Sequence, residues 1–384
     1  MEKQLIKHFT LLTVLTPIAM MYTVGSVPLV TWMMLLLQLE FIIFCIGSSS
    51  GNKCAVNKPL LFFFGYSLLA SLFQMFFKDF TRIDFTAFVN YHFCLCMAMY
   101  GGENWFDYKK GYQWIKNISA FATGYIYMQS VLFKISGRVL SGFIPFLHTD
   151  YVESAEKVMQ GVEYRPTSIF AEPAGYGIYI ALFILLYIHI EKKKNIAFLA
   201  FLCFGVALSK SSAGMISITY VFLTYFLENN SNRLIKRKTL LFIGVAILGV
   251  AMLYQMGYIN VVMEHLFEKK NSGITMATGL TQRIGSYGVA WESLESTVQK
   301  LFGVGFLKNQ FFYLPGSMKL LYFYGMIGTA FFLLLHVWLY NTVSPLGKKI
   351  VMFAFVLSFF SNTILGVQPI VFYPLILADN EVHR

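Results

Sequence analysis

Residues 165–190 read RPTSIFAEPAGYGIYIALFILLYIHI, and this stretch decides the fold class. From residue 168 onward the chain is apolar over the length of a membrane-spanning helix, which needs about 20 residues. Arg165 and Glu172 stand at the start of the run. Charged side chains at the edge of a membrane are energetically costly and usually mark a functional site. The stretch therefore predicts a membrane helix that begins at a functional site.

The composition extends this prediction to the whole chain. Of the 384 residues, 57% are apolar and 13% are charged, whereas a soluble protein carries about 25% charged residues. This deficit predicts a polytopic membrane protein. The net charge of +11 lies largely in short loops between apolar runs, where lysine and arginine set the orientation of the helices. It therefore does not indicate a nucleic-acid partner.

The apolar runs predict an all-α polytopic membrane protein with about eleven (11–12) spans, in which residues 1–384 form a single integral membrane domain. The predicted spans are 9–25, 27–46, 59–77, 85–101, 114–135, 168–190, 195–209, 211–227, 239–257, 316–340 and 350–367. The final run, 368–378, is either a short extra span or a re-entrant segment. We expect the N-terminus to be a short cytoplasmic tail rather than a cleaved signal, because further spans follow at once.

The basic clusters in the short loops predict the orientation. They are Lys53 and Lys58; Lys109 and Lys110; Lys192, Lys193 and Lys194; Arg233, Lys236, Arg237 and Lys238; and Lys348 and Lys349. With the N-terminus in the cytoplasm, all of these clusters face the cytoplasm, as membrane proteins prefer. Two long polar loops, 136–167 and 258–315, are then extracytoplasmic. We expect a short helix at Val152–Met159 and a helical stretch at Ser286–Lys300, ended by the glycines of residues 303–305.

Two prolines fix the backbone around the charged pair. Pro166 follows Arg165 and Pro173 follows Glu172, which predicts that the Glu172 carboxylate lies on the first turn of the helix. The positive end of the helix dipole would then favour an anion at the extracytoplasmic boundary. The alternative is an interfacial arginine that extends toward water and a glutamate that caps the helix or pairs locally.

Two other cations are candidate ligands for an anion. Arg283 lies in the second loop and is either a second diphosphate clamp, since guanidinium binds phosphate in a bidentate way, or a solvated side chain. Lys210 lies in a tight outer turn between two membrane helices and breaks the bias of positive charge toward the cytoplasm. It is either a third anion contact or an interfacial lysine.

Histidines and aromatic residues of the outer loops complete the set of candidates. His148 and His265 are the candidate bases, and the alternative is that each is simply exposed. Tyr313 and Trp291 are candidates for stacking on sugar rings, or they form the core of their loop. The sequence has no phosphate-loop motif, no zinc-protease motif and no Asp-x-Asp pair. We therefore expect no ATP hydrolysis, no metal, no cofactor and no soluble nucleotide-sugar donor.

Four elements in this order resemble the superfamily of bacterial O-antigen and capsule polymerases and ligases. They are RPTSIFAEP at 165–173, LSKSSAG at 208–214, QRI at 282–284, and the pair FGVG at 302–305 and YGMIG at 324–328. The resemblance covers about residues 160–330. Ligases of the superfamily carry a histidine shortly before the last element, and residues 308–315, KNQFFYLP, have none. The resemblance therefore favours a polymerase.

The resemblance implies a GT-C-like, metal-independent glycosyltransferase of the bacterial inner membrane. Such an enzyme joins oligosaccharide repeat units carried on undecaprenyl diphosphate, at the outer face, into O-antigen or capsular polysaccharide. Arg165 and Arg283 would hold the diphosphate with help from Lys210, while Glu172 would orient Arg165 or, less favoured, accept the proton of the acceptor hydroxyl. The general base stays unassigned. Membrane lipid and a chain-length regulator protein are the other partners implied.

Three alternatives stay open from the sequence. A ligase shares the donor and differs only in the acceptor. A transporter or flippase of lipid-linked oligosaccharides would show paired halves and a site at mid-membrane, whereas the unusual charges here lie at the outer boundary. A structural assembly subunit would not need long polar loops with three outer cations.

Overall fold

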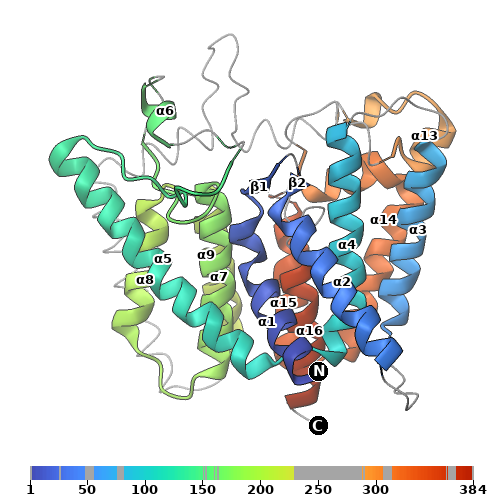
Figure 1. Cartoon of the computed structure of the whole chain (residues 1–384), viewed down its shortest axis with the longest axis horizontal. Coiled ribbons are helices and arrows are strands. Elements are labelled where there is room, and N and C mark those ends of the chain that lie inside the picture. Colours follow the sequence, from blue (N-terminus) through green and yellow to red (C-terminus); the bar gives the residue numbers. More distant parts are fainter. Residues whose placement is uncertain are drawn as a thin grey trace. The chain divides into compact units, whose positions relative to one another are not determined.

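The structure, a computed structural model, is mostly helical and divides into two compact units (Figure 1). It describes residues 2–25, 27–47, 56–75, 82–149, 151, 154–159, 161, 164–228, 288, 290–305, 314–359, 361 and 369–382. The first unit comprises residues 1–118, 143–151 and 285–384, and the second comprises 119–142 and 152–284. Each unit is described below by itself. That residues 1–384 form one membrane domain stays a prediction.

The first unit holds most of the helices. Its elements are α1 (Glu2–Ala19), β1 (Thr23–Val24), β2 (Val27–Pro28), α2 (Leu29–Gly47), α3 (Lys58–Met75), α4 (Arg82–Asn104), the start of α5 (Tyr108–Ser136), α13 (Thr297–Phe302), α14 (Gly316–Thr342), α15 (Pro345–Ser358) and α16 (Pro369–Val382). Helix α16 packs between α4 and α15, and α14 packs against α3 and α15. The second unit contains the rest of α5, α6 (Ser154–Met159), α7 (Pro173–Ile190), α8 (Ile196–Leu208) and α9 (Ser212–Glu228).

Within the described part of the chain, two helices, α7 and α14, are long and apolar enough to cross a membrane. Three shorter apolar helical segments accompany them, at Leu29–Cys45, Ile196–Leu208 and Ser212–Phe226. Helix α7 is apolar on every face and is buried from Tyr176 to Ile188, so it forms the centre of the second unit. Helix α5 packs against α8 there, and the Tyr127 and Phe201 rings stack with centroids 5.1 Å apart. These features are compatible with an all-α membrane protein.

Helices lie in every predicted run except 239–257, which falls outside the described residues. The boundaries of the first two runs were wrong. Helix α1 ends at Ala19, and Thr23–Val24 and Val27–Pro28 form an antiparallel pair of short strands in which Thr23 pairs with Pro28 and Val24 with Val27. Gly25 has a φ of +65°, a conformation that glycine adopts readily. Apolar composition alone does not distinguish such a strand pair from the end of a helix.

The predicted uninterrupted run 316–340 is also wrong in one detail, because α14 is broken at Gly325, where φ is +66°. The break frees three carbonyl groups from the helix, and each has another donor. The N–H groups of Val304 and Gly305 donate to Tyr322 O at 2.8 Å and to Phe323 O at 2.9 Å. The Tyr66 hydroxyl donates to Tyr324 O at 2.8 Å. The segment that directly follows α13 therefore fills the break.

The predicted loop helices are confirmed in part. Helix α6 lies within the predicted Val152–Met159 helix. The predicted stretch 286–300 is not one helix, because residues 294–296 are outside any helix and α13 starts afresh at Thr297. Ser296 and Gln299 form a capping box that begins α13. Gly303, with a φ of +77°, ends it as predicted.

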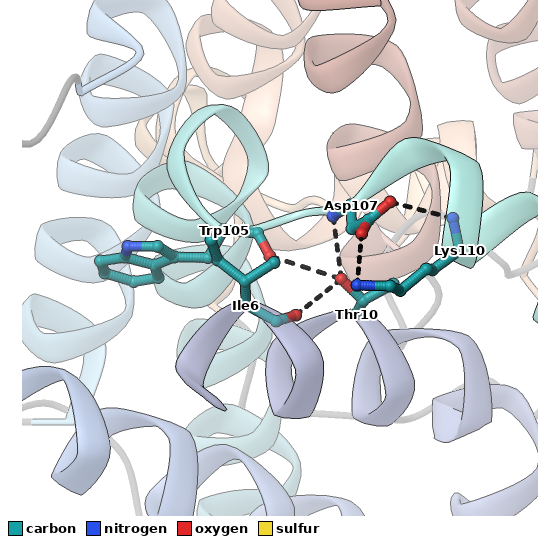
Figure 2. A network of polar contacts seen from close by, with 5 residues as sticks. All are labelled: Ile6, Thr10, Trp105, Asp107 and Lys110. Atoms are coloured by element: carbon teal, nitrogen blue, oxygen red, sulfur yellow. Dashed lines mark hydrogen bonds and ion pairs between the residues drawn. The ribbon is translucent and has the colours of Figure 1, made fainter. Parts of the chain in front are cut away.

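The corner between α4 and α5 is tied to α1 by a polar network (Figure 2). The Thr10 hydroxyl donates to Ile6 O at 2.7 Å and accepts from the Asp107 N–H at 2.9 Å. The Asp107 carboxylate accepts from the Lys110 N–H at 3.0 Å and pairs with Lys110 Nζ at 2.9 Å. Asp107 therefore caps α5, whose first residue is Tyr108.

Candidate functional site

In the second unit, the Arg165 side chain contacts the turn that carries Lys210. The Arg165 Nη2 donates to the backbone oxygen of Lys210 at 2.8 Å, although the two residues are 45 positions apart. Both residues are half-buried. The contact joins the Arg165 guanidinium to the backbone of the turn that carries Lys210. That the two cations bind one anion stays a prediction.

The turn that carries Lys210 has an unusual backbone. Lys210 has a φ of +52°, a left-handed conformation that usually belongs to glycine or asparagine at the end of a helix. Its N–H donates to Ala207 O at 3.0 Å, which closes the end of α8. The Ser211 hydroxyl accepts from the Gly214 N–H at 3.0 Å and caps α9. The turn is thus fixed on both sides of Lys210.

The loop that carries Arg165 is fixed by α5. Ser168 has a φ of +56°, its N–H donates to Gln129 Oε1 at 2.9 Å, and its hydroxyl donates to Ala122 O at 2.7 Å. The same Gln129 side chain donates through Nε2 to Leu140 O at 3.0 Å. Gln129 therefore joins the backbone at Leu140 to the backbone at Ser168 from a buried position on α5.

The start of α7 differs from the prediction. The predicted span began at residue 168, but Ser168 is held by α5 and the helix begins at Pro173. Proline suits the first helical position because the N–H that it lacks would have no helical acceptor. Glu172 is consequently the N-cap and does not lie on the first turn. It is exposed, and its side chain makes no cap hydrogen bond.

Glycines bring helices α7 and α9 into direct contact. A Cβ on Gly177 would lie 2.6 Å from the Gly214 Cα, so only glycine allows α7 and α9 to approach this closely. Gly177 lies early in α7 and Gly214 early in α9. The N-terminal ends of both helices therefore lie together beside Arg165 and Lys210. Two positive dipole ends thus add to two cations.

The elements FGVG at 302–305 and YGMIG at 324–328 meet in the first unit. A Cβ on Gly303 would lie 2.3 Å from Phe323 O, and one on Gly325 would lie 2.3 Å from Leu301 O. Gly303 and Gly325 are therefore required for packing the segment after α13 against the break in α14. No catalytic role is needed to explain them.

The structure gives less information on the other predicted site residues. His148 is exposed in the first unit, and its backbone oxygen accepts from the Thr23 N–H at 2.9 Å. Arg283, His265 and Tyr313 lie outside the described residues. Trp291 lies under Lys300, whose Nζ is 5.3 Å from the ring centroid. This contact favours a structural role for Trp291.

Tyr164, next to Arg165, was missed by the sequence prediction. Its side chain is buried and its ring lies 4.2 Å from the Phe133 ring. Among the described residues, none forms a hydrogen bond with its hydroxyl. Burial raises the pKa of Tyr164 to about 12, so the hydroxyl keeps its proton and is available as a donor. No local pattern in the sequence distinguishes this tyrosine from the others in the chain.

The chain matches no family model, no curated protein and no solved structure.

Proposed function

We propose that this chain is a multi-pass inner-membrane glycosyltransferase that joins polyprenyl-diphosphate-linked oligosaccharide units into a polysaccharide. The observation that carries the proposal is the hydrogen bond from Arg165 to the Lys210 turn. It concentrates positive charge at a site where α7 and α9 both begin. A diphosphate is the anion that such a lipid-linked donor would supply.

The proposed topology has about eleven spans, including 239–257, with the N-terminus in the cytoplasm. Consecutive helices then alternate in direction, so the start of α7 and the α8–α9 turn both face outward. The exposed Lys192, Lys193 and Lys194 lie at the other end of α7 and would face the cytoplasm. The outward location of Arg165 and Lys210 matches the face at which lipid-linked units are polymerised.

The proposed reaction moves a glycan from its lipid diphosphate to a sugar hydroxyl of a second lipid-linked unit. The bond between the sugar carbon and the diphosphate oxygen breaks, and a glycosidic bond forms with the acceptor oxygen. The acceptor proton passes to a base, and the lipid diphosphate leaves with its negative charge. Arg165 and Lys210 would stabilise that charge, which is the main demand of such a transfer.

Glu172 has two candidate roles in this reaction. Its exposed carboxylate at the start of α7 would orient Arg165, which is the role we favour, or accept the acceptor proton. Arg283 stays a predicted second clamp on the diphosphate. The Tyr164 hydroxyl is a further donor to a phosphate or sugar oxygen.

Gene deletion followed by gel analysis of the surface glycan tests the proposal. Loss of the chain should leave single-repeat glycan in place of long polymers. Wild type and a Lys193→Met control should restore the ladder, whereas Arg165→Ala should not, with equal amounts of protein in the membrane. Full ladders from Arg165→Ala would contradict the clamp. Long but unattached polymers in the deletion strain would indicate a ligase.

One observation favours a transporter of lipid-linked oligosaccharides as the second candidate, namely the break in α14. Transporters often build their sites from interrupted helices whose free carbonyls coordinate ions. Here the carbonyls of Tyr322, Phe323 and Tyr324 already accept hydrogen bonds from Val304, Gly305 and Tyr66. The break is thus satisfied by protein, which favours the polymerase. For a transporter, deletion would leave single units on the cytoplasmic leaflet.

A further inference from the structure

Lys319 is a buried cation that the proposed reaction does not use. It lies in the first turn of α14, in the first unit, and only 9% of its surface is exposed. Among the residues that the structure describes, none forms a hydrogen bond or an ion pair with its ammonium group. Buried lysines are rare in proteins unless they are paired. This side chain therefore has no anionic partner among the described residues.

The position of Lys319 within the helix also favours an anion. The first turn of a helix carries the positive end of the dipole, which favours acidic side chains and disfavours lysine. Side chains in a helix tilt toward its N-terminus, so the Lys319 side chain leaves α14 in the direction of the helix N-terminus. The positive charge of Lys319 and the positive end of the helix dipole therefore lie at the same end of α14. An anion would stabilise both of them at once.

The start of α14 has no side-chain cap. Its N-cap residue is Pro315, which makes no side-chain hydrogen bond, and the Gly316 N–H donates to Ser361 O at 2.9 Å. Gly316 is also close-packed, since a Cβ there would lie 3.0 Å from the same oxygen. The helix end is thus fixed in place by backbone contacts, while its dipole is not offset by a carboxylate or hydroxyl of the N-cap.

We propose that Lys319 and the N-terminus of α14 form a binding site for a phosphate-bearing anion. The site belongs to the first unit and is separate in sequence from Arg165 and Lys210. It does not rest on the proposed function. The phosphate would come either from a soluble diphosphate or from the headgroup of an anionic lipid.

Lys348 provides a matched control. It occupies the same position in α15 as Lys319 does in α14, and each N–H donates to its own N-cap oxygen at 2.8 Å. In α15, however, the Ser344 hydroxyl caps the helix through the Gly347 N–H at 2.9 Å. Lys348 is half-buried, with its Nζ 5.5 Å from the centroid of the Tyr340 ring. It has the same charge but not the same need for an anion.

The test measures thermal unfolding of the full chain in maltoside micelles, which contain no phosphate. Inorganic pyrophosphate is titrated in one arm, and phosphatidylglycerol is mixed into the micelles in the other. A ligand that binds the folded state raises the unfolding temperature. We expect Lys319→Met to weaken the apparent affinity by about tenfold or more, as for loss of a charge-assisted contact. Lys348→Met should leave it unchanged, and Lys319→Arg should retain most of it.

The two arms distinguish the sources of the phosphate. A Lys319-dependent response to pyrophosphate supports a soluble or diphosphate ligand, and one confined to phosphatidylglycerol supports a lipid headgroup. Responses that are absent in both arms, or that are equal in wild type and Lys319→Met, would overturn the site. Loss of polymerisation in cells plays no part in this readout, so the proposed function and this site can fail independently.

Discussion

At the scale of single residues, Gln129 determines where Arg165 lies. Its side chain accepts from the Ser168 N–H and donates to Leu140 O. It therefore joins two backbone positions that are 28 residues apart in the sequence. Replacing it by leucine leaves the N–H of the buried Ser168 and the backbone oxygen of the half-buried Leu140 without this partner, at a cost of about 1–3 kcal/mol for the buried group. We expect Gln129→Leu to lower the unfolding temperature in micelles and to reduce chain elongation.

A conservative variant separates positioning from simple stability. Gln129→Glu keeps the acceptor for the Ser168 N–H but loses the donor to Leu140 O. It should therefore retain more elongation than Gln129→Leu at equal amounts of folded protein. Equal elongation by wild type and Gln129→Leu would show that Gln129 does not position Arg165.

Asp107 is a residue whose effect on stability depends on pH. Burial alone raises the pKa of its carboxyl, but hydrogen bonds from Lys110 and the charge of Lys110 outweigh burial and lower the pKa below 3.8. The ionised form is thus favoured by folding. The stabilisation is present above the unfolded-state pKa and is lost as the pH falls through the lower folded-state value.

The Asp107→Asn variant tests this dependence. Asparagine is also a good N-cap, so the cap on α5 is retained while the ion pair with Lys110 is removed. We expect the unfolding temperature of the variant to change less than that of wild type between about pH 5 and pH 3. Identical slopes in the two proteins would contradict the assignment.

At the scale of elements, the contact between α7 and α9 brings the candidate site together. It depends on Gly177 and Gly214, because a Cβ on either residue would lie within 2.7 Å of the Cα of the other. Gly177→Leu should separate the helices and abolish elongation. Gly124→Ala on α5 is the control, since a Cβ there meets nothing within 4 Å. Alanine there should stabilise the helix by up to about 1 kcal/mol.

The measurement for this pair is thermal unfolding, together with the yield of folded protein. A Gly177→Leu protein that melts like wild type would show that the close approach is not required. A loss of elongation in Gly124→Ala would show that the assay responds to any change in the second unit.

The elements also show what sequence could predict and what it could not. Long apolar runs predicted α7 and the two helices after it, because burial or lipid contact requires apolar side chains over the full helix. The strand pair of β1 and β2 and the break at Gly325 were missed, since each depends on a local positive φ and on distant partners. The contact of Arg165 with Lys210 O spans 45 residues, and no local pattern encodes it. Lys319 was missed because it stands within an apolar run.

At the scale of the whole molecule, the proposed topology predicts which side of the membrane each loop faces. His148 is exposed and lies in the predicted first outer loop, whereas Lys193 is exposed in a predicted cytoplasmic turn. In a background without the five native cysteines, His148→Cys should react with an impermeant maleimide in spheroplasts. Lys193→Cys should react only after the membrane is permeabilised. The opposite labelling pattern would invert the topology.

The central claim is that Arg165 and the Lys210 turn bind the diphosphate of a lipid-linked glycan during polymerisation. The most direct test adds the purified chain to undecaprenyl-diphosphate-linked repeat units in micelles and measures the length of the lipid-linked product. Wild type should produce a ladder of longer chains without an added metal or nucleotide. Arg165→Lys should retain part of the activity, because it keeps the charge but not the planar guanidinium, and Arg165→Ala should produce no ladder. A wild-type chain that fails to elongate the units, or an Arg165→Ala chain that elongates them equally well, would contradict the account.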